Sequence, residues 1–135
     1  MRTPRLLVTL AMTGALVGGG LVGATSASAA TCYSGATSYE KSSTTHYVPG
    51  GGKYHLTGPN CADINIKMSA PKEVKVCFYK KSADGMHVLL NYCQSSYKLP
   101  KSNKWLVVAS NVKNNVLYKF YFKDISSKSL GWYAD

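Results

Sequence analysis

The stretch Val74–Cys93, VKVCFYKKSADGMHVLLNYC, determines the fold predicted for this chain. Apolar residues alternate with other residues over 74–80, which is the period-two pattern of a half-buried strand. The pair Asp84-Gly85 is a turn signal, and the apolar run over 86–93 follows it. The stretch therefore predicts an antiparallel β-hairpin.

This hairpin places two cysteines opposite each other. Residues that face each other across Asp84-Gly85 have numbers that sum to 169 or 170, and Cys77 and Cys93 give 170. Facing residues of a non-hydrogen-bonded pair lie close enough for a disulfide. The chain has four cysteines, an even number, which in an oxidising compartment indicates two disulfides. The preferred pairing is 77–93 with 32–61, and the sequence leaves the other two connectivities open.

The same cysteines do not have the spacing of a metal or redox site. Zinc ligands occur at short spacings such as C-x-x-C, and redox cysteine pairs share that motif. Cys77 and Cys93 are 16 residues apart, and His87 between them would be a third ligand without a fourth. We expect neither a metal site nor a cofactor.

The remaining segments with strand patterns extend the β prediction to the rest of the chain. They are 62–69, 104–110, 116–123 and 130–135, with an irregular or edge strand within 37–48. Six or seven short strands separated by turns predict an all-β fold, either an antiparallel sandwich or a partly closed barrel. Phe78, Trp105, Phe120 and Phe122 are expected in its core.

The first thirty residues have the pattern of a secretory signal peptide. A basic start, an apolar run and the small-residue exit ATSASAA occur in that order, and they predict cleavage after Ala29 or Ala30. Residues 31–135 then form a single extracellular domain with no membrane span. A membrane anchor is the alternative, because the apolar run approaches the length that spans a bilayer.

The expected mature domain is strongly basic. Loss of Arg2 and Arg5 leaves 14 lysines against six acids, a net charge of +8. Such a charge attracts anionic surfaces. Arginine makes the two-point contacts that read phosphates and guanine edges, and its absence argues against specific nucleic-acid recognition.

No catalytic motif is evident in the sequence. It contains no G-x-S-x-G, H-E-x-x-H or P-loop pattern, and the six acids are scattered. His46 and His55 flank a glycine-rich loop and are expected to be exposed, and His87 is expected on the outer side of a strand. We therefore predict that the protein is not an enzyme and has no catalytic residues.

Tyrosines and lysines are the candidate binding residues. Six tyrosines in polar contexts are expected to be partly exposed: Tyr33, Tyr39, Tyr47, Tyr54, Tyr97 and Tyr121. Rigid amphipathic rings make good contacts at low entropic cost. The segment KLPKSNK (98–104) is the best candidate for a constrained, exposed loop. The candidate binding set is Tyr47, Tyr54, Tyr97, Lys98, Lys101 and Lys104.

Several segments resemble small exported proteins of filamentous actinobacteria of the Streptomyces type. They are ATSASAA, TCYS, YHLTGPNCADINIKMS, VKVCFY and the tryptophan segment KWLVVAS. In that group C-A-D-I-N, V-x-V-C-F and a later cysteine recur. The resemblance covers most of residues 31–135 and implies export and disulfides without implying a chemistry. The wholly lysine basic set departs from it, because such organisms favour arginine.

These observations predict a secreted, non-enzymatic binding module for an extracellular protein or a cell-envelope polymer. One form of it is a small subunit of an exported assembly. Two alternatives are an inhibitor of an extracellular protease or other exoenzyme, acting through 98–104, and a basic antibacterial protein acting on anionic surfaces. The sequence does not indicate the oligomeric state.

Overall fold

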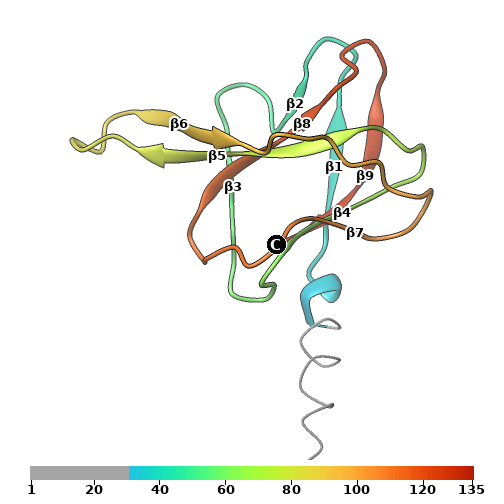
Figure 1. Cartoon of the computed structure of the whole chain (residues 1–135), viewed down its shortest axis with the longest axis horizontal. Helices are drawn as coiled ribbons and strands as arrows, with labels where there is room; N and C mark the ends of the chain where they lie inside the picture. Colours follow the sequence, from blue (N-terminus) through green and yellow to red (C-terminus); the bar gives the residue numbers. More distant parts are fainter. Residues whose placement is uncertain (1–30) are drawn as a thin grey trace, which may run out of the picture.

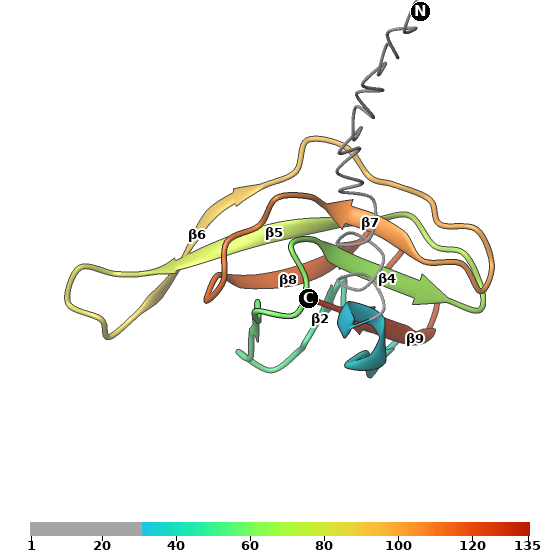
Figure 2. The same ribbon diagram turned by 90° about the horizontal axis from the view of Figure 1, so that it is seen from below.

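A computed structural model describes residues 31–135, and the predicted signal peptide, residues 1–30, lies outside the described residues. The described part contains two antiparallel β-sheets that pack face to face (Figures 1 and 2). One helical turn, residues 31–34, precedes the first strand. The all-β prediction is confirmed. The two sheets do not close into a barrel, so the fold is the sandwich alternative.

Nine strands occur in residues 31–135, and six of them, β4 to β9, lie where strand patterns were predicted. The strands are β1 (Thr37–Lys41), β2 (Tyr47–Val48), β3 (His55–Leu56), β4 (Ile64–Met68), β5 (Val74–Lys81), β6 (Val88–Cys93), β7 (Leu106–Ala109), β8 (Leu117–Phe122) and β9 (Ser129–Ala134). The segment expected to be an irregular strand divides into β1 and β2.

Apart from the β5–β6 hairpin, the paired strands are not neighbours in sequence. The first sheet has the order β1-β9-β4-β7, and the second has the order β2-β8-β5-β6 with β3 also paired to β8. The last strand of the chain is therefore an inner strand, between β1 and β4. Gly131 permits this pairing, because a Cβ there would collide with the carbonyl of Lys67 on β4.

The core between the sheets is made of the alternating apolar residues that the sequence indicated. Fully buried side chains come from three strands in particular: Ile64, Ile66 and Met68 of β4, Val74 and Val76 of β5, and Tyr118, Phe120 and Phe122 of β8. Burial of such side chains stabilises a fold by about 1.5–3 kcal/mol each. Phe78 is also buried, as predicted.

Two aromatic residues are placed differently from the predictions. Tyr39, which was expected to be partly exposed, is 7% exposed and packs against Phe120 and Phe122. Its hydroxyl shares a hydrogen bond with Ser129 of the neighbouring β9, so a polar group is satisfied inside the core. Trp105, which was expected in the core, is only half-buried and stacks on Tyr33 with ring centroids 4.6 Å apart.

Both predicted disulfides are present. Cys77 faces Cys93 across the β5–β6 pair, and Cys32 is bonded to Cys61. The paired residue numbers take both of the sums that the hairpin allows. They add to 170 at Cys77 and Cys93, and after a register shift that follows Phe78 they add to 169 at Tyr79 and Leu90. Gly85 has a φ of 72°, the left-handed conformation that its turn requires.

Candidate functional site

The three histidines lie in different surroundings. His55 lies among the rings of Tyr118, Phe120 and Tyr133, so the expectation of an exposed loop histidine is wrong. Burial, with a smaller effect from the charge of Lys119, lowers the pKa of His55 to about 4. His46 is half-buried with Nδ1 3.0 Å from the carbonyl oxygen of Phe122. His87 is exposed in the loop between β5 and β6, not within a strand.

Within residues 31–135, no group of three or more histidine, cysteine or carboxylate side chains is arranged to hold a metal ion. The same part of the chain contains no helix that is long and apolar enough to cross a membrane.

The loop 98–104 is held at both ends by backbone hydrogen bonds. Lys98 exchanges two such bonds with Val74, at 2.8 and 2.9 Å, and the amide of Asn103 donates to the carbonyl of Met68 at 2.9 Å. Pro100 is buried, whereas Lys98, Lys101 and Lys104 are exposed. The three candidate lysines therefore lie on a constrained loop, as inhibitory loops require.

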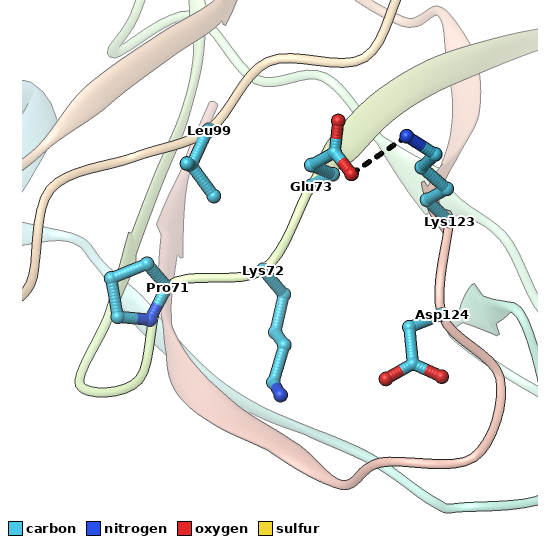
Figure 3. Close-up of a pocket in the computed structure, with 6 residues that line it drawn as sticks. All are labelled: Pro71, Lys72, Glu73, Leu99, Lys123 and Asp124. Carbon is cyan, nitrogen blue, oxygen red and sulfur yellow. Dashed lines mark ion pairs between the residues drawn. The ribbon is translucent and has the colours of Figure 1, made fainter.

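A hollow of about 420 Å³ lies beside this loop (Figure 3). Leu99, which is 63% exposed, projects along one side of it, and the ion pair between Lys123 and Glu73, 2.9 Å long, lies on the other side. The side chains of Lys72 and Asp124 also line it and run in roughly the same direction. Its charged groups are of both signs, so the hollow shows no preference for a charged ligand.

The candidate tyrosines Tyr47, Tyr54 and Tyr97 lie on the outer face of the β2-β8-β5-β6 sheet. The Tyr47 and Tyr54 rings both cover the ammonium of Lys119, with centroids 4.4 and 4.6 Å from Nζ. The Tyr97 ring covers Lys75, with its centroid 4.6 Å from Nζ. The structure thus brings the three tyrosines onto one face, and it separates Lys101 and Lys104 from them on the 98–104 loop.

The β5–β6 hairpin projects beyond the body of the sandwich (Figures 1 and 2). Four large apolar side chains on β6 and the turn before it are exposed: Met86 by 80%, Leu89 by 47%, Leu90 by 57% and Tyr92 by 55%. Isolated exposed apolar residues are ordinary, but a cluster on one projecting element indicates an interaction site. We refer to residues 80–92 as the arm.

The free edge of β6 adds unpaired backbone groups to this apolar surface. β6 is the last strand of its sheet, and its outer edge pairs with no strand among the described residues. Its sequence, VLLNYC, has no charged residue. Soluble proteins normally protect an edge with lysine, proline or a bulge, because an open apolar edge pairs with other chains. β6 has neither lysine nor proline, and the one irregularity in its pairing with β5 is the register shift after Phe78.

A groove of about 680 Å³ runs beside β6 on its core-facing side. Its apolar lining comes from Phe78, Tyr92, Val112 and Val116, and its polar lining includes Asn91, Gln94 and Asn111. The Gln94 side chain is already used, since its amide donates to the carbonyl of Val108 and its oxygen accepts from the amide of Val76. Both polar groups of the Gln94 side chain are therefore hydrogen-bonded within the protein.

Sequence reasoning identified β6 as a strand but missed the arm as a site. The signal was present in the consecutive residues Leu89 and Leu90 within an uncharged run, because adjacent strand residues point to opposite faces. Apolar residues on both faces predict a strand buried on both sides, and here neither side is covered within residues 31–135.

Comparisons with known proteins do not identify this chain: no family model matches it, and no curated protein or solved structure matches it at a significant level.

Proposed function

We propose that this protein is an extracellular, non-enzymatic binding module that engages a protein partner through the arm. The partner adds a strand to the open edge of β6 and covers Leu89, Leu90 and Tyr92. The observation that carries this proposal is the exposed, uncharged edge strand beside a groove lined by both apolar and polar side chains. In strand addition, main-chain hydrogen bonds supply affinity, and pockets for alternate side chains supply specificity.

The two disulfides support an extracellular setting for this role. Disulfides persist in oxidising compartments, and a rigid scaffold lowers the entropic cost of binding. The Cys77–Cys93 bond lies at the base of the arm and fixes β6 against β5. The arm is thus presented in a defined conformation, which suits a subunit of an exported assembly.

A capture experiment with matched variants tests the proposal. Immobilised protein is incubated with culture supernatant at physiological salt, and Leu90→Lys is compared with Leu130→Lys. These leucines are 57% and 54% exposed and lie on different sheets, so the two variants change charge and exposure alike. We expect one stoichiometric protein to bind the wild type and Leu130→Lys, and to be lost from Leu90→Lys.

Capture that survives in Leu90→Lys would contradict the proposal, and so would the absence of any bound protein at physiological salt. Sedimentation velocity of the protein alone tests whether the partner is a second copy of this chain. A dimer that dissociates in Leu90→Lys identifies the partner as a second copy of this chain.

Protease inhibition is the second candidate function, favoured by the anchoring of the loop 98–104 at both ends. A constrained loop that carries exposed lysines fits a protease that cleaves after lysine. Inhibition that saturates at a one-to-one ratio, and that is lost in the combined variant Lys101→Gln and Lys104→Gln, is expected on this hypothesis. Rapid cleavage of the loop without inhibition would exclude it.

A further inference from the structure

Lys119 on β8 is a buried cation without a hydrogen-bond acceptor. Its neighbours Tyr118 and Phe120 point into the core, so strand alternation directs Lys119 to the outer face of its sheet. The side chain is nevertheless only 6% exposed. Within residues 31–135, the Lys119 ammonium makes no ion pair or side-chain hydrogen bond, and the one ion pair there joins Lys123 to Glu73.

Tyrosine rings form a cage around this ammonium. Nζ of Lys119 lies 4.4 Å from the ring centroid of Tyr47, 4.6 Å from that of Tyr54 and 6.0 Å from that of Tyr79. Tyr54 and Tyr79 also meet edge to face with centroids 4.8 Å apart. Ring faces attract a cation, but they leave its three N–H donors without oxygen acceptors. Burial lowers the pKa of Lys119, as expected for a charge that water solvates poorly.

The cage does not seal the Lys119 ammonium from solvent completely. Among the described residues, the one side-chain nitrogen or oxygen that is sealed from solvent and has no partner is Nε2 of His55, so the Lys119 ammonium is not sealed. Burial first, and then the nearby side chains of Tyr121, Tyr54 and Tyr47, raise the pKa of Tyr79, and each of these side chains carries a hydroxyl. These hydroxyls are further donors for a ligand.

The strands of the surrounding face carry no acidic residue. The outward residues of β2, β3, β5, β6 and β8 include Lys75, Lys81 and Lys119 but no aspartate or glutamate. Glu73 continues the outward series before β5, and Lys123 already binds its carboxylate. A ligand at the cage therefore meets a cation without a competing internal anion.

We propose that Lys119 and the hydroxyls of Tyr47, Tyr54 and Tyr79 form a binding site for an oxyanion group, the phosphate or carboxylate of an anionic polymer. The oxyanion accepts hydrogen bonds from the ammonium and from the tyrosine hydroxyls, which supplies the oxygen acceptors that the protein itself lacks. This site lies on a sheet face, not at the strand edge where the arm engages its partner. A test of this site can therefore succeed or fail whatever the outcome for the proposed function.

The test is a titration followed by NMR of the tyrosine ring and lysine side-chain signals. Inorganic phosphate and acetate are added in separate arms at pH 7, with total ionic strength held constant by chloride. We expect saturable shifts at Tyr47, Tyr54 and Tyr79 with at least one of the two ions. Tighter binding of phosphate indicates a phosphodiester polymer, and tighter binding of acetate indicates a carboxylate polymer.

Two variants show whether the cage is the site. Lys119→Met keeps an unbranched apolar stem among the rings and removes the charge, and we expect it to weaken binding at least tenfold. Lys113→Met removes an exposed charge elsewhere and should change affinity less than twofold. If Lys119→Met does not fold, Tyr54→Phe provides the test, because it retains the ring and the cation and loses only a hydroxyl donor; a severalfold weakening is expected.

The absence of saturable shifts with both ions would overturn the proposal. Equal affinity of the wild type and Lys119→Met would overturn it as well. So would unchanged affinity in Tyr54→Phe where that variant provides the test.

Discussion

His55 makes the stability of the fold depend on pH in a direction that the structure fixes. The ring packs against Tyr118, Phe120 and Tyr133 with centroids 5.1, 5.8 and 4.2 Å away, and its buried Nε2 has no hydrogen-bond partner within residues 31–135. A proton on this ring would place a charge in an apolar site near Lys119. Burial first, and the Lys119 charge second, therefore lower the pKa from 6.5 to about 4.

The sign of the effect follows from which state binds the proton. The unfolded chain takes up a proton on His55 near pH 6.5, whereas the folded protein does so only near pH 4. Stability from this group is complete above pH 6.5 and is lost as the pH falls toward 4, because there the unfolded state binds more protons. At about 1.4 kcal/mol for each pKa unit, the full loss is roughly 3 kcal/mol.

Urea unfolding of the wild type and of His55→Phe at pH 7.5 and 4.5 measures this contribution. Phenylalanine preserves the ring contacts and cannot take up a proton, and every other titrating group is common to both proteins. Between the two pH values the wild type should lose roughly 2.5 kcal/mol more unfolding free energy than the variant. Equal losses in the two proteins would refute the reasoning, as would an NMR titration that places the pKa of His55 near 6.5.

Two further substitutions test the structure. Lys41 is 1% exposed, and its Nζ donates to three backbone carbonyls at 2.8, 2.9 and 3.1 Å. Lys41→Met should therefore lower the unfolding free energy by roughly 2–5 kcal/mol. The control Lys128→Met replaces an exposed lysine and should stay within about 0.5 kcal/mol of the wild type. Gly131→Ala should lower Tm strongly or prevent folding, because the added Cβ would meet the Lys67 carbonyl. Gly50→Ala should not, because there is open space around Gly50. A wild-type Tm in Gly131→Ala would show that β9 does not pack against β4 as described.

Features that depend on local pattern could be predicted from the sequence. Alternation over β5 and β8 predicts which side chains enter the core, because the side-chain period of a strand is two. The turn at Asp84-Gly85 predicts the facing positions of Cys77 and Cys93, because hairpin register follows from the turn. The candidate tyrosines Tyr47 and Tyr54 were identified as surface residues, although their contact with Lys119 was not predicted.

Features that depend on distant segments could not be predicted. The closing segment reads as a short terminal strand, yet β9 lies between β1 and β4, and no local signal specifies which strands pair across such separations. His55 reads as a loop histidine beside glycines, and only the arrival of Tyr118 and Tyr133 from the far end of the chain buries it.

The sequence by itself determined the local features of this protein. They are strands with a period of two, one hairpin with its cysteines in register, and basic residues that are all lysine outside the first thirty residues. The tertiary structure alone decided how those parts are used. It left β6 uncovered at a sheet edge, and it enclosed one of fourteen lysines in tyrosine rings. The physical reason is that exposure and charge burial depend on which strands become neighbours, and strand order is a property of the whole chain.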